Sequence, residues 1–265
     1  MVAVDLKHFD SHGYAVARQI VPEAHCARLV SAIESRLDTR RDDPSTWYGS
    51  NPALLDLVPL WGHQAQWDIR QSPALHEIWA QLWQTDALLV SLDRCRFTPP
   101  WRPGRPEPLP IHWDHNPHDA TLRWIQGVVA LTDTGIGQGG FRCAPWLYQD
   151  KAAWPVDPST SYGWQPKADD EDILEVPAGT GDLIVWDSRL PHANSKNISQ
   201  VPRFAFYVQM FPVDEGERQI LVECWRTGRC HPAWRDWPEH DIPEPWPSAT
   251  LTALGRHLVG LDPWP

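Results

Sequence analysis

Short apolar stretches separated by turn-forming residues dominate the sequence from residue 87 onward, and this pattern constrains the fold most. Turn signals lie at Pro99-Pro100 and across residues 135–140 and 177–182. Strands do not alternate regularly with helices here, which disfavours a parallel α/β sheet and favours an antiparallel sandwich or barrel. The expected strands span residues 87–97, 109–114, 122–132, 173–176, 183–186 and 203–211.

Helical periodicity is confined mainly to the N-terminal part of the chain. Ser72 as a cap and Pro73 in the first turn mark the start of one helix, and apolar residues at helical spacing mark the others. The expected helices span residues 22–37, 73–83 and 249–258. A short strand is expected over residues 13–17. Residues 42–67, rich in Trp, Pro, Asn and Gly, are expected to form an irregular loop or lid.

Composition bounds the class of protein. With 265 residues, the chain fits one domain spanning residues 1–265, and its apolar runs are far shorter than a membrane span. The net charge of −11 disfavours nucleic acid as a partner, because a phosphate backbone needs clustered Lys and Arg. Five cysteines without close pairing are typical of reduced thiols, and the first residues match no targeting peptide, so a cytoplasmic location is expected. The sequence leaves the oligomeric state open.

A histidine and a carboxylate are paired within one predicted strand. His112 and Asp114 lie two residues apart, so in a strand both side chains point to the same face and can bind one ion. His192 follows a turn and an apolar stretch at residues 181–186 and can supply a third donor. Two histidines and one carboxylate form a facial triad that leaves positions open on the metal. Open positions favour iron(II), because O2 and a bidentate co-substrate need them, over structural zinc, which is enclosed by protein ligands.

Two other groups of potential ligands are weaker. His8 and Asp10 have the same His-x-Asp spacing but no strand-and-turn context, so we expect them at the surface. Cys224, Cys230 and His231 lack a fourth ligand and a short Cys-x-x-Cys pair, which disfavours a structural zinc site. The triad of His112, Asp114 and His192 is therefore the predicted metal centre.

An arginine follows the third donor on the next predicted strand. Arg203 stands eleven residues after His192 and shares one strand face with Ala205, Tyr207 and Gln209. A guanidinium beside a metal can hold a carboxylate through two parallel hydrogen bonds. Arg203 is therefore predicted to anchor the far carboxylate of a dicarboxylic co-substrate.

Several motifs, taken in order, are similar to those of one known family. They are Phe9-x-x-x-Gly13-Tyr14 before an amphipathic helix, Leu92-Asp93-Arg94-Cys95-Arg96-Phe97 before a Pro-rich loop, His112-Trp113-Asp114, Leu131-Thr132-Asp133, Gly139-Gly140 leading to Pro145, Gly181-Asp182, His192 and Arg203. Over nearly its whole length the chain resembles the phytanoyl-CoA dioxygenase superfamily of iron(II)- and 2-oxoglutarate-dependent enzymes.

The resemblance implies a mainly β fold with flanking helices, namely a double-stranded β-helix of the jelly-roll, cupin-like type. It also implies iron(II) bound by the triad, 2-oxoglutarate as co-substrate with its far carboxylate on Arg203, and O2 as oxidant. In relatives a polar or cationic residue on the strand before the His-x-Asp pair assists 2-oxoglutarate, which points here to Arg94 ahead of Arg96. The family serine two residues after the distal histidine is replaced by Asn194, with Ser195 one residue further on.

The resemblance further implies the type of reaction. Halogenating relatives replace the carboxylate ligand by a small residue, whereas Asp114 is present, so hydroxylation of an aliphatic C–H with release of succinate and CO2 is expected. Desaturation, epoxidation and ring rearrangement stay open. The expected substrate is a small organic metabolite, since no basic cluster supports a coenzyme A thioester. The residues expected near the mouth of the site are His115, His118, Gln126, Arg142 and Trp146.

Two other functions fit the same triad. A metal-dependent isomerase or epimerase could use the same barrel, with Arg203 then incidental, and a non-catalytic barrel could bind a small ligand. Dependence on oxygen and 2-oxoglutarate separates the first from an oxygenase, and the complete triad argues against the second.

Overall fold

The computed structural model describes residues 3–49, 57–119, 121–154, 164–166, 172–236 and 249–265. Its largest sheet has the strand order β1-β7-β4-β9-β3, and all neighbouring strands are antiparallel. These strands are β1 Tyr14–Ala17, β3 Cys95–Thr98, β4 Ile125–Ala130, β7 Leu183–Asp187 and β9 Arg203–Tyr207. Consecutive strands of the chain are thus rarely neighbours in the sheet, as in a jelly roll.

A smaller sheet packs against the inner face of the large one. Its order is β6-β5-β8, with β5 Phe141–Cys143, β6 Leu174–Glu175 and β8 His192–Asn194. Side chains of both sheets form one interior cluster between them, made of Val128, Ala130, Phe141, Cys143, Val176, Ala178, Ile184, Trp186, Leu190 and Ala205. The mainly β, jelly-roll fold expected from the sequence is therefore confirmed.

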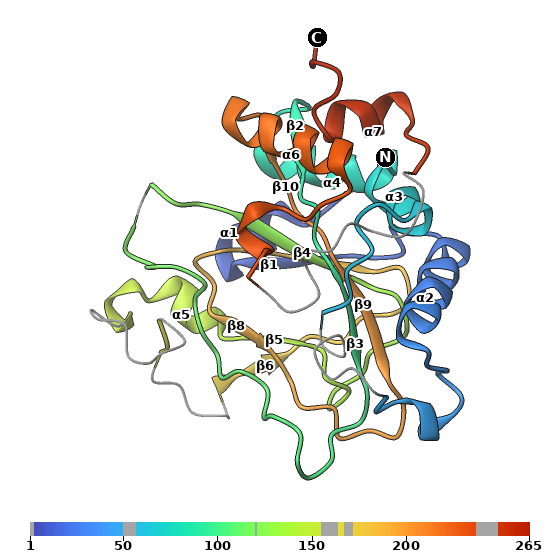
Figure 1. Ribbon diagram of the computed structural model, residues 1–265. Helices are drawn as coiled ribbons and strands as arrows, with labels where there is room; N and C mark the ends of the chain where they lie inside the picture. Colours follow the sequence, from blue (N-terminus) through green and yellow to red (C-terminus); the bar gives the residue numbers. More distant parts are fainter. Residues whose placement is uncertain (1–2, 50–56, 120, 155–163, 167–171, 237–248) are drawn as a thin grey trace.

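The outer face of the large sheet is covered by helices. Strand β7 is buried on both sides: Ile184 and Trp186 face the interior cluster, whereas Leu183 and Val185 belong to a second cluster with the helices. The covering helices are α2 Glu23–Leu37, α3 Gln64–Arg70, α4 Pro73–Trp83, α6 Glu215–Thr227 and α7 Ala253–Leu258. Figure 1 shows them apart from β5, β6 and β8.

The remaining elements close the edges. Helix α1 Leu6–His12 contacts α5 Pro145–Gln149, and β2 Leu88–Val90 pairs with β10 Met210–Pro212 as a separate ribbon. In the described part of the chain, short 3₁₀ turns lie in the connections, at Pro44–Thr46, Lys151–Ala153 and Pro232–Trp234. Within the described residues, no helix has the length and apolar character needed to cross a bilayer.

A glycine sets how closely a helix approaches the large sheet. A Cβ at Gly127 would lie 2.8 Å from Cζ2 of Trp79 on α4 and 2.9 Å from the carbonyl oxygen of Val208. Both distances are shorter than side chains tolerate, so any larger residue would push α4 away from strand β4.

Several predicted elements differ from the structure. The expected strand 109–114 is an extended segment held by two isolated bridges, because Pro108 and Pro110 cannot donate to a ladder. The expected strands 87–97 and 203–211 each divide between the large sheet and the β2–β10 ribbon. Residues 42–67, expected to be irregular, include the start of α3. The helices α1, α5 and α6 and the strands β5 and β8 were not predicted.

Candidate metal centre

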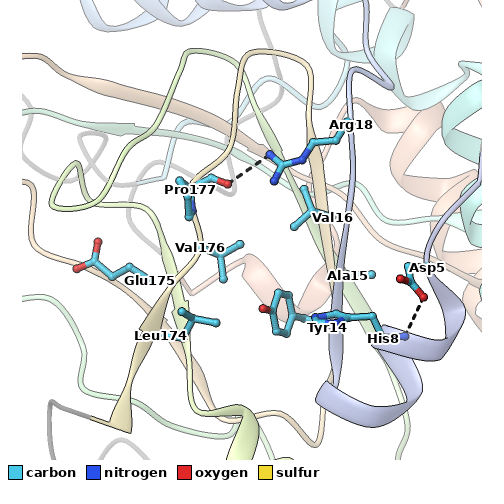
Figure 2. Close-up of a pocket in the computed structure, with 10 residues that line it drawn as sticks. All are labelled: Asp5, His8, Tyr14, Ala15, Val16, Arg18, Leu174, Glu175, Val176 and Pro177. Atoms are coloured by element: carbon cyan, nitrogen blue, oxygen red, sulfur yellow. Dashed lines mark hydrogen bonds between the residues drawn. The ribbon is translucent and has the colours of Figure 1, made fainter.

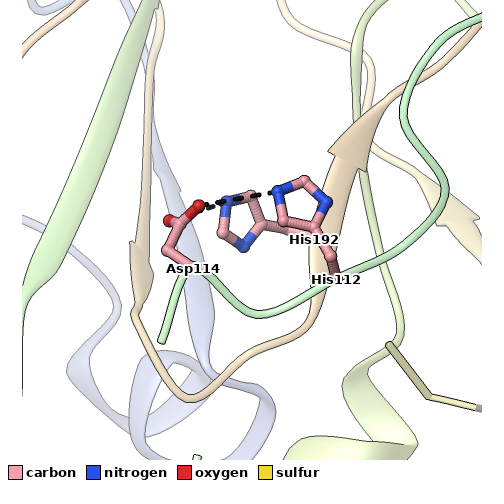
Figure 3. Close-up of side chains that lie close together, drawn as sticks. All are labelled: His112, Asp114 and His192. Atoms are coloured by element: carbon pink, nitrogen blue, oxygen red, sulfur yellow. Dashed lines mark ion pairs between the residues drawn. The ribbon is translucent and has the colours of Figure 1, made fainter. Parts of the chain in front are cut away.

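Three possible metal donors converge where the extended segment that carries His112 and Asp114 lies beside strand β8. His112 and His192 form an isolated antiparallel bridge, with backbone N···O distances of 3.1 and 3.0 Å. Nε2 of His112 lies 3.5 Å from Oδ1 of Asp114, and Nε2 of His192 lies 3.6 Å from Oδ2 (Figure 3). Among the described residues this is the one group of His, Cys, Asp or Glu that could hold an ion, with donor atoms within 4.8 Å of one another.

The hydrogen bonds of the two imidazoles direct the same nitrogen toward the centre of the group. Nδ1 of His112 lies 2.9 Å from the carbonyl oxygen of Pro110, and Nδ1 of His192 lies 3.0 Å from that of Leu190. A carbonyl only accepts, so in the neutral imidazoles each Nδ1 carries the hydrogen and each Nε2 keeps its lone pair. Protonated His112 carries a second hydrogen on Nε2, which faces Asp114. Metal-binding histidines are commonly oriented in this way.

The ionisation of the three side chains also suits a cation. Burial acts to raise the pKa of Asp114, but the hydrogen bond from His112 and the charges of both histidines outweigh it and hold the pKa well below its usual range. Burial lowers the pKa of His192. For His112 burial also acts downward, but hydrogen bonds to Asp114 and Pro110 raise its pKa above 6.5. A carboxylate and two imidazoles with free Nε2 atoms fit a divalent transition metal.

The residue between His112 and Asp114 fixes their direction. Trp113 points to the opposite side, where its Nε1 donates to the carbonyl oxygen of Arg189 over 2.8 Å. It is buried in a third cluster with Ala144, Leu147 and Trp154. This anchor turns both potential ligands toward His192, although the segment is not part of a strand.

Arg203 lies on β9, on the interior side of the large sheet. Its side chain is 4% exposed, and Nη1 donates to Oδ1 of Asn194 over 2.9 Å. No carboxylate among the described residues forms an ion pair with it, whereas buried charges in proteins are normally paired. The hydroxyl of Tyr207 accepts from Nδ2 of the same Asn194 over 3.0 Å. Arg203, Asn194 and Tyr207 are thus one connected polar group beside His192.

The strand register also locates the two candidate arginines of the preceding strand. Arg96 pairs with Ala205, so it projects to the same side of the sheet as Arg203 and Tyr207. Burial acts to raise the pKa of Tyr207, but the charges of Arg96 and Arg203 outweigh it and lower that pKa. Arg94 precedes the start of β3, and its guanidinium lies 3.8 Å from the ring centre of Trp234. The structure thus places Arg96 beside Arg203 and Arg94 against Trp234, and which of the two assists 2-oxoglutarate stays a prediction.

The other predicted residues occupy different positions. Gln126 donates from Nε2 to Oδ2 of Asp114 over 2.8 Å and therefore contacts the centre directly. His115 is buried against the edge of Trp124, with ring centres 4.9 Å apart. Ser195 follows Asn194 in the strand direction and therefore points to the opposite face.

Arg142 and the remaining aromatic residues lie away from the donors. Phe141 and Cys143 face the interior cluster, so Arg142 between them faces outward, where it donates to the carbonyl oxygen of Leu109 over 3.3 Å. Trp146 packs against the Trp113 cluster, and His118 lies edge-on to Trp154. Arg142, expected near the mouth of the site, thus lies on the face of β5 that points away from the metal donors.

Cys224, Cys230 and His231 do not form a second metal site in the described part of the chain. Sγ of Cys224 lies 3.4 Å from the carbonyl oxygen of Cys230, and His231 pairs with Glu217 at 3.3 Å. His8 lies on α1, stacked on His12 with ring centres 4.2 Å apart, and Asp10 is exposed. His8 is half-buried beside Tyr14 (Figure 2), so the surface position expected for this pair is found for Asp10 and not for His8.

A jelly-roll barrel with an open two-histidine, one-carboxylate centre defines a class, the oxygenase-type proteins that bind one transition metal at the end of the barrel. The family model for phytanoyl-CoA dioxygenase (PhyH) matches residues 9–205. The chain therefore belongs to the phytanoyl-CoA dioxygenase family.

Individual relatives agree with this placement. A putative phytanoyl-CoA dioxygenase of Dictyostelium discoideum is 23% identical over 263 residues, covering 77% of this chain and 74% of the relative. EvdO2 from Micromonospora carbonacea var. aurantiaca, solved with 2-oxoglutarate, has a TM-score of 0.56 and 20% identity over 80% of this chain and 94% of its own. The epimerase SnoN, solved with Fe3+, alpha-ketoglutarate and nogalamycin RO, has a TM-score of 0.59 and 14% identity. The match covers 93% of this chain and 94% of SnoN. At these identities the solved structures establish the shared fold.

Proposed function

We propose that this protein is an iron(II)- and 2-oxoglutarate-dependent oxygenase that hydroxylates an aliphatic C–H of a small organic metabolite, with release of succinate and CO2. Family membership and the donor set support an oxygenase-type enzyme. The observation that carries the proposal is the buried guanidinium of Arg203, which has no carboxylate partner among the described residues and lies beside the metal donors. Such a charge needs an anionic ligand.

The spacing of the site suits a five-carbon dicarboxylate. Asn194, which contacts Arg203, comes two residues after His192 on β8, and two residues of a strand span roughly 6.6 Å. The keto-acid end of 2-oxoglutarate at the metal and its far carboxylate at Arg203 would be separated by a similar length.

Each part of the site would have a separate role. His112, Asp114 and His192 would hold the iron(II), which when bound supplies the activation of O2 and the oxidative chemistry. Arg203 would bind the far carboxylate through charge-assisted hydrogen bonds, and Asn194 would hold the guanidinium in place through the bond of 2.9 Å. The interior cluster between the sheets would exclude water from the co-substrate.

A second candidate is an epimerase or another rearrangement that also needs iron and 2-oxoglutarate. The likeness of the fold to the epimerase SnoN favours including it. It differs from hydroxylation in the product, which keeps the mass of the substrate instead of gaining one oxygen atom. The metal-dependent isomerase without 2-oxoglutarate would leave Arg203 unexplained. A non-catalytic barrel could hold an anionic ligand on Arg203, and production of succinate separates it from an oxygenase.

The partner we propose is therefore a small molecule, not nucleic acid or a membrane, and the location we propose is the cytoplasm. No disulfide joins any of the five cysteines, which suits a reducing compartment. The chain carries a net charge of −11, which opposes contact with polyanions.

The test uses the purified protein without oxygen. Addition of iron(II) and then 2-oxoglutarate should produce the visible charge-transfer absorption of a keto acid chelated to iron(II), and admission of O2 should convert 2-oxoglutarate to succinate. The His112→Ala variant should give neither signal. Absence of the absorption band in a wild-type protein that binds iron(II) would exclude 2-oxoglutarate as the co-substrate.

A further inference from the structure

We infer that Gln126 is a positioning residue that holds Asp114 with Oδ1 free for the metal, and that Trp186 sets the orientation of the Gln126 amide. This inference rests on the proposed metal centre, because it concerns how one of its three ligands is held. The residues come from neighbouring strands: Gln126 lies on β4, and its pairing partner Trp186 lies on β7. Both project to the interior side of the large sheet.

The hydrogen bonds of Gln126 determine which end of its amide faces the carboxylate. Nε1 of Trp186 lies 2.9 Å from Oε1 of Gln126, and an indole nitrogen can only donate. The amide oxygen must therefore face Trp186. The amide NH2 then faces Asp114, where Nε2 lies 2.8 Å from Oδ2. The two hydrogen bonds form a series from Trp186 through Gln126 to Asp114. Their direction is fixed because the indole N–H of Trp186 can donate but cannot accept.

This series of hydrogen bonds distinguishes the two oxygens of Asp114. Oδ2 accepts the hydrogen bond of Gln126 and lies 3.6 Å from Nε2 of His192, whereas Oδ1 accepts no hydrogen bond from Gln126 and faces the ring nitrogen of His112 at 3.5 Å. A carboxylate held at one oxygen by a charge-assisted donor presents the other oxygen to an ion. Binding through Oδ1 alone would keep the remaining positions of the ion open, which is what a bidentate co-substrate and O2 require.

Trp186 is also fixed by its surroundings, so it can act as a reference point. Its ring lies 4.6 Å from that of Phe141 and 5.0 Å from that of His192, measured between ring centres, and it is 3% exposed. The indole thus touches one ligand directly and reaches another through Gln126. Trp186 therefore connects the packing of the interior cluster to the positions of His192 and Asp114.

The test measures metal binding and ligand geometry without turnover. Cobalt(II) is titrated into the metal-free wild type and into Gln126→Met, which has a similar volume but neither hydrogen bond, and the visible cobalt spectrum reports coordination. Loss of an outer contact to a ligand costs roughly 10- to 100-fold in metal affinity. We expect Gln126→Met to lose affinity in that range and to change the intensity of the cobalt bands. The control is Gln149→Met, the same substitution at an exposed glutamine whose side chain donates to the carbonyl oxygen of Ser11. It should leave the cobalt affinity and the cobalt spectrum unchanged.

A second variant separates positioning from general packing. Trp186→Phe keeps an aromatic ring but removes the Nε1 donor, so it should weaken cobalt binding in the same direction. The double variant Gln126→Met with Trp186→Phe should bind no more weakly than Gln126→Met alone, because both changes break one series of hydrogen bonds. Thermal melting of the metal-free proteins checks that each variant is folded.

The possible outcomes separate this inference from the proposed function. If wild type binds no cobalt(II), or Asp114→Ala binds it equally well, the metal centre itself is wrong. If wild type binds it and Gln126→Met gives the same affinity and spectrum, the centre stands and the role of Gln126 is refuted. Additive losses in the double variant would assign Trp186 a packing role only and overturn the proposed series of hydrogen bonds.

Discussion

Nη1 of Arg203 donates to Oδ1 of Asn194 over 2.9 Å, and this bond joins strand β9 to the strand that carries His192. The guanidinium is thereby held in place before any ligand arrives. A ligand carboxylate would meet a site that needs little reorganisation, which is the condition under which a buried charge pair contributes net affinity.

Replacing Arg203 by Gln should weaken 2-oxoglutarate binding strongly. Removing one partner of a desolvated charge pair costs roughly 2 to 5 kcal/mol, or about 30-fold to several thousand-fold in affinity. Arg203→Lys should recover only part of this, because an ammonium cannot form two parallel hydrogen bonds. Titration of 2-oxoglutarate into the anaerobic iron(II) protein measures both, and iron binding itself should be unaffected. Wild-type affinity in Arg203→Gln would direct attention to Arg96.

Tyr207→Phe should also weaken 2-oxoglutarate binding, by a smaller factor. The hydroxyl accepts from Nδ2 of Asn194 over 3.0 Å, and its own hydrogen has only a long contact of 3.4 Å to Oδ1 of Asn194 among the described residues, so a far carboxylate can take this hydrogen bond. A hydrogen bond to a charged group contributes roughly 1.5 to 3 kcal/mol, or about 10- to 150-fold. The control is Tyr14→Phe, since Tyr14 packs against the same interior cluster. Equal affinities in the two variants would show that Tyr207 does not touch the co-substrate.

His112→Ala should abolish iron-dependent turnover, whereas His8→Ala should leave it nearly unchanged. Both histidines belong to a His-x-Asp sequence, but among the described residues only His112 belongs to a group of three donors that lie within 4.8 Å of one another. The measurement is iron(II) content after dialysis, followed by succinate production. Equal losses in the two variants would refute the assignment.

Asp114→Gly should eliminate hydroxylation without unfolding the protein. The side chain is 33% exposed and lies outside the three apolar clusters, so its loss leaves the packing intact. Gain of halogenation is not expected, because the surroundings must also favour a halide. Product analysis by mass spectrometry, with circular dichroism for the fold, tests this. Near-normal hydroxylation would mean that Asp114 is not a required ligand.

Metal binding should weaken as the pH falls, starting above pH 6.5. The hydrogen bonds of His112 to Asp114 and Pro110 raise its pKa from that ordinary value, so protons compete with the metal earlier than at a free histidine. In the metal-free protein the sign for stability is opposite: the pair of protonated His112 with Asp114 stabilises the fold at low pH and this contribution is lost as the pH rises through the raised pKa. NMR titration of His112 in wild type and Asp114→Asn tests the cause, since the pKa should drop in the variant.

Much of the site could be predicted because its signals are local. The spacing of His112 and Asp114 requires only that the segment be extended, and this holds although the segment is not a strand. The strand that begins at Arg203 was predicted because its side chains alternate between two faces, with Arg203, Ala205 and Tyr207 on one of them. The same locality explains the success with the helices over residues 22–37 and 73–83, where several turns of periodicity accumulate.

What could not be predicted depends on register or on very short elements. Strands β5 and β8 have three residues each, too few for a period to appear. The contact of Tyr207 with Asn194 needs two strands aligned to within one residue, and that of Gln126 with Asp114 needs strand β4 aligned with an extended segment far along the chain. Helix α6 is different, because Asp214 accepts from the backbone N–H of Glu217 at its start, and this Asp-x-x-Glu capping signal was present in the sequence.

The segment that carries His112 and Asp114 is joined to its neighbours by isolated bridges, at His192 and Trp164, and not by a continuous ladder. Small displacements of the two ligands therefore break few backbone bonds, and the centre can adapt to ions of slightly different radius. Such a site discriminates little by fit, so affinities should follow the Irving–Williams order, with nickel, copper and zinc above iron(II). The metal found in protein purified from cells would then report which ion was in excess during growth and chromatography, and the working ion has to be identified by reconstitution.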